Sequence, residues 1–158
     1  MSLSGIDATD IAILNLLQED ARITNKEIGF LTKKSLSAVQ VRISKLIDSG
    51  IIEKFTTLLN RKKVGLGLAV YTMIKLKDSS KIALVEFTEA AIRLDEVMEC
   101  YHMSGEYDFT MKIVLKDMEA YNKFIHEKLS LIPHMATVKS MFVIDELKYE
   151  VGARLQAS

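Results

Sequence analysis

The sequence has one cysteine, one proline and no tryptophan among 158 residues, and its 21 basic residues balance 21 acidic ones. Cys100 alone cannot form an internal disulfide, which excludes a disulfide-stapled scaffold. No run of 18 apolar residues and no signal-peptide pattern occurs, so we expect no membrane partner and a cytoplasmic location. With 49% hydrophobic and 27% charged residues, the composition is typical of a globular protein with one domain or two small ones.

The motifs of catalysis, metal binding and cofactor binding are also missing. His102, His126 and His134 lack the close spacing of a zinc motif, and a single cysteine provides no thiolate cluster. No G-x-S-x-G motif, phosphate loop or G-x-G-x-x-G motif occurs. Cys100 lies in an apolar segment, which favours a small core residue over a nucleophile. We therefore predict no catalytic residue, no metal, no cofactor and no enzymatic activity.

The zero net charge conceals a segregation of charge along the chain. Between Thr32 and Lys63 there are eight basic and two acidic residues, a net charge of +6. From Val64 onward there are eleven basic and fourteen acidic residues, a net charge of −3. A nucleic-acid-binding module joined to a module with another task would show this distribution, and so would a locally basic, solvated face.

Helix signals in the first sixty residues predict three helices followed by an extended segment, Ile51–Leu59. Asp7 can cap a first helix, and Thr24 with Glu27 forms a capping box for a short second one. Ser35 or Ser37 can cap a third helix whose apolar residues recur at helical spacing before Gly50. Short helix, tight turn and longer helix is the helix-turn-helix plan, in which the last helix enters a major groove.

The face of the third helix opposite its apolar stripe suits a DNA groove. It carries Ser37, Ala38, Val41, Ser44 and Lys45, with Gln40 and Arg42 on its flanks. Gln pairs with adenine, Ser and Lys with phosphates or base edges, and Ala and Val with thymine methyl groups. Three-helix bundles also serve as protein-interaction modules, so the pattern alone leaves both functions open.

The remainder of the chain alternates between strand and helix signals after a basic linker at residues 61–67. Strands are predicted at Leu68–Leu76, Val97–Met103, from Phe109 and from about Val138 to Tyr149, and helices at Ile82–Leu94 and after Asp117. The order strand, helix, strand, strand, helix, strand predicts a ferredoxin-like βαββαβ domain at residues 68–158, beside a helix-turn-helix domain at 1–60. Because both helices would cover one face, the other face favours a dimer.

Between the second and third strands, residues 102–108 combine a turn glycine with polar groups. Ser104 and backbone N–H groups could bind the carboxylate of an α-amino acid, and Asp108 its ammonium. An ordinary hairpin also needs a glycine and polar residues, so the spacing alone favours the plain turn.

Taken together, these segments resemble, along the whole chain, the Lrp/AsnC family of leucine-responsive and asparagine-responsive transcription regulators. The resemblance rests on separated motifs in the family's order: DATDIAIL at 7–14, ARITN at 21–25, SLSAVQVRISKLIDSGII at 35–52, ECYHMSGEYDF at 99–109, Pro133 and VIDELK at 143–148. Two departures stand out. Thr32, Lys33 and Lys34 replace an apolar residue and Gly-Leu, and Val41 replaces a polar residue.

The resemblance implies an N-terminal winged helix-turn-helix domain and a C-terminal domain that forms dimers and often octamers. It implies that Lys33, Lys34, Ser35, Ser37, Gln40, Arg42 and Lys45 serve double-stranded DNA. It implies further that Met103, Ser104, Gly105, Tyr107, Asp108 and Ser140 line a site for an amino-acid effector. We therefore expect a sequence-specific regulator tuned by an amino acid, and the competing hypothesis is a small-molecule sensor whose helical domain recruits a protein.

Overall fold

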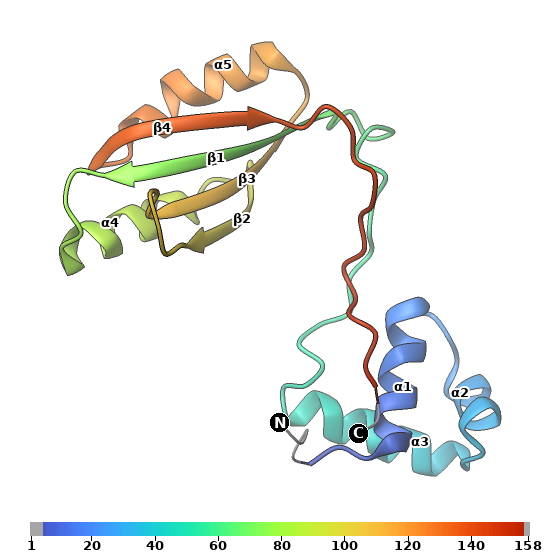
Figure 1. Ribbon diagram of the computed structural model, residues 1–158. Helices are drawn as coiled ribbons and strands as arrows, with labels where there is room; N and C mark the ends of the chain where they lie inside the picture. Colours follow the sequence, from blue (N-terminus) through green and yellow to red (C-terminus); the bar gives the residue numbers. More distant parts are fainter. Residues whose placement is uncertain (1–4, 157–158) are drawn as a thin grey trace. The chain divides into compact units, whose positions relative to one another are not determined.

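The computed structural model describes residues 5–156 and divides the chain into two units. One unit consists of Met1–Leu58 and Lys148–Ser158, and the other is Leu59–Leu147. Among the described residues, the first unit holds three helices and the second a four-stranded sheet with two α-helices (Figure 1). The predicted fold class, a helix-turn-helix domain followed by a ferredoxin-like domain, is confirmed.

The helices of the first unit begin at the capping residues that the sequence predicts. They are α1 (Ala8–Glu19), α2 (Asn25–Thr32) and α3 (Leu36–Asp48). The Asp7 carboxylate accepts the N–H groups of Thr9 and Asp10, and Thr24 and Glu27 cap α2 reciprocally. Of the two serines that could cap α3, Ser35 does so. A small apolar core that includes Ile13, Ile28 and Val39 joins the three helices.

The expected extended segment after α3 does not form a strand. Residues 53–60 have no regular secondary structure, and residues 61–65 form a turn. A strand requires a partner chain for its backbone groups, and the described residues provide none here. The segment instead contributes Ile52 to the helical core, where its N–H donates to the carbonyl of Leu46 at 3.0 Å.

The second unit contains one antiparallel sheet with strand order β2-β3-β1-β4. Its elements are β1 (Leu68–Leu76), α4 (Lys81–Ala91), β2 (Val97–His102), β3 (Phe109–Leu115), α5 (Met118–Glu127), a short 3-10 turn (Leu129–Leu131) and β4 (Met135–Phe142). This order and connectivity are those of the βαββαβ arrangement.

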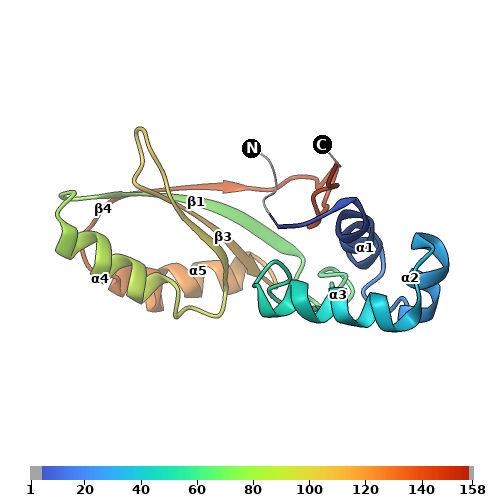
Figure 2. The same ribbon diagram turned by 90° about the horizontal axis from the view of Figure 1, so that it is seen from below.

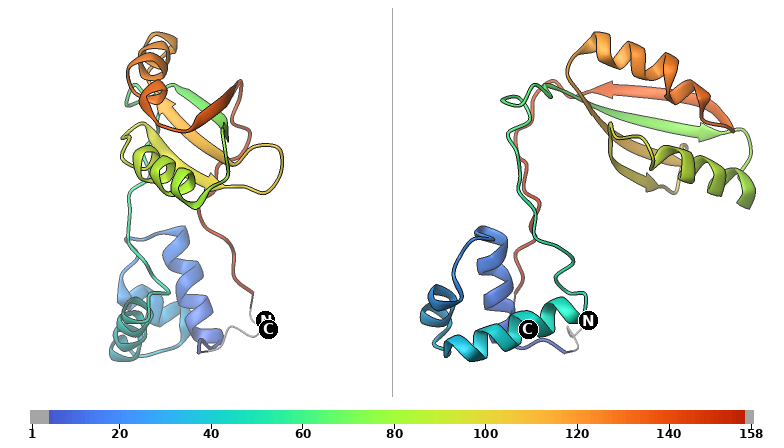
Figure 3. Two further views of the ribbon diagram at one scale, coloured as in Figure 1. Left: turned by 90° about the vertical axis from the view of Figure 1, so that its left-hand side faces the viewer. Right: turned by 180° about the vertical axis from the view of Figure 1, so that it is seen from behind.

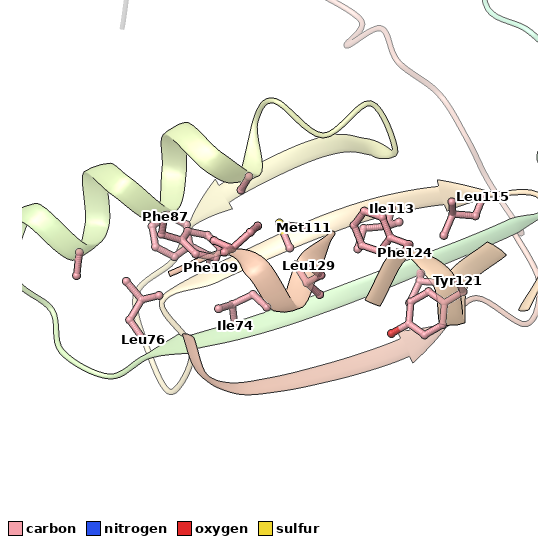
Figure 4. Packing of buried hydrophobic residues seen from close by; sticks show 14 residues of the cluster. Ile74, Leu76, Phe87, Phe109, Met111, Ile113, Leu115, Tyr121, Phe124 and Leu129 are labelled. Carbon is pink, nitrogen blue, oxygen red and sulfur yellow. The ribbon is translucent and has the colours of Figure 1, made fainter. Parts of the chain in front are cut away.

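Helices α4 and α5 both cover the same face of this sheet (Figure 2), and the main core lies between the two layers. Phe87 of α4 packs on Phe109 of β3 with ring centroids 4.5 Å apart, and Phe124 of α5 is buried beside Ile113 and Met111 (Figure 4). The alternate side chains of β1 and β4 point to the uncovered face, where Tyr71 and Met141 are partners in register and are both exposed.

The last strand is shorter than predicted. β4 ends at Phe142, which pairs with Val70, and the N–H of Val143 still donates to the carbonyl of Ala69 at 3.0 Å. Beyond this point only Leu68, the first residue of β1, remains. The structure groups Lys148 and the residues after it with the helical unit, so the C-terminal boundary of the sheet unit differs from the expected 158.

Candidate functional site

The exposed face of α3 is fixed by the burial of its opposite face. Val39 and Leu46 are 0% and 3% exposed and hold the helix on α1 and α2. Ser37, Gln40 and Lys45 consequently lie in solvent, as the sequence predicts. The Ser35 hydroxyl, which we also expected on the DNA side, accepts the N–H of Ala38 at 3.2 Å and therefore caps the helix.

The turn between α2 and α3 closes tightly, although Lys33 stands where the sequences that this chain resembles have a glycine. Lys33 adopts the left-handed conformation, with φ 54°, and Lys34 donates its N–H to the carbonyl of Gly29 at 2.9 Å. A Cβ at Gly29 would lie 2.8 Å from the carbonyl oxygen of Lys34. Gly29 is thus required by a close backbone approach, while Lys33 and Lys34 present both side chains to solvent.

Arg42 does not extend freely from α3. Its Nη1 donates to Asp7 Oδ2 and to Asp10 Oδ1, each at 2.8 Å. The hydrogen bond to Asp10, and after it the one to Asp7, raises the pKa of Arg42. The backbone N–H of Asp10 and then the guanidinium of Arg42 lower the pKa of Asp7. The pair therefore joins the start of α1 to the middle of the predicted recognition helix.

This arrangement adds acidic residues to the surface that α3 presents. A groove of about 700 Å³ is lined by Asp7 and Asp10 as well as by Ser37, Val41 and Lys45. The sequence marks Asp7 and Asp10 only as capping residues, because one sequence gives no signal that residues more than thirty positions apart are paired. The groove provides cationic and hydroxyl groups on one side and, on the other, two carboxylates of which Arg42 offsets one negative charge.

The hairpin between β2 and β3 brings most of the predicted effector residues together. The N–H of Met103 donates to the carbonyl of Asp108 at 2.8 Å, and Gly105 has φ +129° at the exposed tip. Met103, Ser104 and Gly105 are exposed, and Tyr107 and Asp108 are partly buried.

Asp108 is anchored to the neighbouring strand β1 through two groups. Its Oδ2 accepts the N–H of Leu76 at 2.7 Å, and its own N–H donates to the carbonyl of Ile74 at 2.9 Å. Within residues 5–156, no hydrogen bond to Oδ1 is found, so this oxygen is available to a ligand. The carboxylate therefore terminates β1 and keeps one oxygen at the hairpin.

Ser140 lies apart from this hairpin in the chain. Its partner in register is Thr72, which is also paired with Met111 in the middle of β3. Asp108, by contrast, comes directly before Phe109, the first residue of β3. The Tyr121 hydroxyl is 2.5 Å from Ser140 Oγ, which lies 3.2 Å from Thr72 Oγ1. Ser140 thus belongs to a hydroxyl cluster between the sheet and α5.

Across the described part of the chain, no three His, Cys, Asp or Glu side chains are grouped in a way that could hold a metal ion. Within the same range, no helix has the length and apolarity needed to cross a bilayer. Burial raises the pKa of the Cys100 thiol, which favours the unreactive form.

Two family models match the two structural units. Residues 6–53 match a winged helix-turn-helix DNA-binding model, and residues 69–152 match the Lrp/AsnC ligand binding domain. The chain belongs to the Lrp/AsnC family. It is a DNA-binding transcriptional regulator, since both the helix-turn-helix and the ligand-binding domain of these regulators are present.

Known members of the Lrp/AsnC family are similar to this chain over nearly the whole length of both proteins. The transcriptional regulator AzlB of Bacillus subtilis is 37% identical, over 93% of this chain and 94% of that protein. The leucine-responsive regulatory protein of Klebsiella pneumoniae is 32% identical, over 90% and 87%. A Neisseria meningitidis transcriptional regulator solved in complex with L-Met is 31% identical with a TM-score of 0.87, over 92% of this chain and 94% of that one.

Proposed function

We propose that this regulator acts in the cytoplasm as a homodimer that places α3 of each protomer in the major groove of a pseudo-palindromic DNA site and responds to an amino acid. The observation that carries the proposal is the solvent-exposed face of α3, which includes Ser37, Gln40 and Lys45, with two lysines at its entry turn. Lysine contacts to phosphate supply affinity, and polar side chains on the helix read base edges.

The roles of the DNA-facing residues differ according to their local bonds. Gln40 is exposed and can contact base edges, and so can the Ser37 hydroxyl, which lies 3.2 Å from the Ser35 hydroxyl; Lys45 and the turn lysines can contact phosphates. Arg42 acts mainly as a positioning residue, because two carboxylates hold one of its terminal nitrogens. Its remaining N–H groups can still reach DNA.

The proposed effector site is the hairpin around Gly105. Asp108 Oδ1 would accept the ammonium of an α-amino acid, while Ser104 and backbone N–H groups at the tip would donate to its carboxylate. The apolar side chain of Met103 favours an effector with an apolar side chain. The relative from Neisseria meningitidis, whose structure contains L-Met, supports an effector of this class.

The uncovered sheet face is the proposed dimer interface. It exposes Tyr71 and Met141, and it buries the ammonium group of Lys112 against Glu99 at 3.1 Å. Apolar side chains in register over two strands would be covered by the same face of a second copy. An effector that prefers one assembly state of these dimers would then shift DNA affinity through the population of that state.

Fluorescence anisotropy on the DNA upstream of the protein's own gene tests the proposal. We expect affinity that falls steeply with salt, and a shift on addition of a mixture of the twenty amino acids. Absence of binding at low salt, on this and on unrelated duplex DNA, would instead support recruitment of a protein. Binding that no amino acid shifts would contradict the effector assignment alone.

A pair of hairpin variants locates the effector site. Asp108→Asn keeps an oxygen for the N–H of Leu76 but removes the negative charge that an ammonium needs. We expect it to abolish the amino-acid response and to leave DNA binding of the free protein unchanged. The matched control is Glu106→Gln, which removes an exposed carboxylate from the same tip and should retain the response. A response retained in Asp108→Asn would place the effector elsewhere.

A further inference from the structure

The end of the chain returns to the DNA-binding unit. After β4 the chain runs in extended form, and the residues from Lys148 onward group with the three helices. Figure 3 shows this last segment, in red, approaching the blue α1 helix. The effector domain is therefore inserted between two segments of one DNA-binding unit.

Two amide side chains of α1 hold the backbone of the returning segment. Asn15 Nδ2 donates to the carbonyl of Leu155 at 3.0 Å, and the N–H of Leu155 donates to Asn15 Oδ1 at 2.9 Å. Gln18 Nε2 donates to the carbonyl of Ala153 at 3.1 Å. Asn15 and Gln18 are three positions apart in a helix and so lie on one face, and Ala153 and Leu155 are two positions apart in an extended segment and so point to one side. The spacing of the two side chains therefore matches the spacing of the backbone groups that they bind.

Side-chain packing adds selectivity to these backbone hydrogen bonds. Leu155 packs against the helical core that contains Leu14 and Ile13. A Cβ at Gly152 would lie 2.8 Å from Gln18 Oε1 and 3.3 Å from Gln18 Cβ, so a side chain here would displace Gln18. The tail also forms one wall of a cavity of about 1020 Å³ beside α1.

We propose that α1 carries a peptide-docking site whose occupant is residues 151–155 of the same chain, and that the docked tail is a working part of the DNA-binding domain. The tail holds α1, and α1 holds α3 through the pairing of Asp10 with Arg42. Docking thus supports the recognition helix through α1. The docked tail also attaches the effector domain to the DNA-binding unit at a second place, in addition to the linker after Leu58.

Hydrogen exchange of the full-length chain, read by mass spectrometry over α1, tests this docking. Gly152→Val and deletion of residues 151–158 alter only the tail, so their effect on α1 reports contact between the two. We expect amide exchange in α1 to become about tenfold faster in both variants. The matched control is Arg154→Ala, which removes an exposed side chain from the same segment and should leave exchange unchanged.

A third variant tests the site from the helix side. Asn15→Asp keeps the acceptor for the N–H of Leu155 but loses the donor to its carbonyl, and should also speed exchange in α1. The effect should be independent of protein concentration, because the occupant belongs to the same chain. Unchanged exchange in Gly152→Val and in the deletion would overturn the proposal, and exchange that accelerates on dilution of the unaltered protein would overturn docking within one chain.

Discussion

Arg42 shows at the residue scale how far a helical wheel can place a functional side chain. The wheel predicts that Arg42 flanks the DNA-facing surface, and its guanidinium does lie beside the groove that contains Lys45. The wheel contains no information about α1, so it does not predict the hydrogen bonds to Asp7 and Asp10. Substitution of Arg42 therefore alters the packing of two helices as well as any DNA contact, and Lys45 is the better probe of DNA binding.

The charge of Asp7 makes part of this unit's stability dependent on pH. The folded-state pKa of Asp7 is lowered from 3.8, so its contribution to stability is complete above that value and is lost as the pH falls through the folded pKa. Asp7→Asn retains a capping side chain without the charge. We expect it to lower the Tm at pH 7 and to lower it by less near pH 3, as measured by circular dichroism. Glu19→Gln, at the other end of α1, serves as the control, and an equal Tm difference at both pH values would contradict this.

The left-handed conformation of Lys33 provides a second prediction at this scale. A residue with a Cβ costs about 1–2 kcal/mol in this conformation, and glycine loses about 0.5–1 kcal/mol through its flexible unfolded state. Lys33→Gly should therefore raise the free energy of unfolding by about 0.5 kcal/mol, measured by urea denaturation. The neighbouring Lys34→Gly is the control and should not stabilise the protein, and a destabilised Lys33→Gly variant would contradict the strain argument.

At the scale of the element, local signals predict the starts of helices well. Asp7, Thr24, Ser35 and Asp117 all cap helices, because capping depends on residues only two or three positions away. Strand ends depend on distant partners instead. The sequence predicts that β4 continues to Tyr149, but β4 ends at Phe142, which pairs with Val70 close to the start of β1.

The hairpin and Ser140 illustrate the same difference for the candidate site. Residues 103–108 are contiguous, so the sequence could predict that they share a turn. Ser140 reaches the sheet through β4, and its contacts with Thr72 and Tyr121 depend on register and on how α5 packs. A family resemblance placed Ser140 in the effector site, and within one chain it lies in a hydroxyl cluster under α5.

The uncovered sheet face leads to a prediction at the scale of the whole molecule. Met141 is 46% exposed on this face, and Met118 on α5 is 49% exposed, so the two methionines form a matched pair. Met141→Glu should shift the protein from dimer to monomer, because a carboxylate at an apolar interface loses its hydration. Size-exclusion chromatography with light scattering would measure the change. Met118→Glu should leave the mass unchanged, and a dimeric Met141→Glu variant would place the interface elsewhere.

The central claim is that α3 contacts DNA, and the salt dependence of binding in Lys45→Ala tests it most directly. Loss of one phosphate contact lowers the slope of log affinity against log salt by about 0.9. Fluorescence anisotropy should show weaker binding and this smaller slope for Lys45→Ala, but unchanged binding for Lys81→Ala, which removes an exposed lysine from the effector domain. Equal affinities and slopes for Lys45→Ala and the unaltered protein would contradict the account.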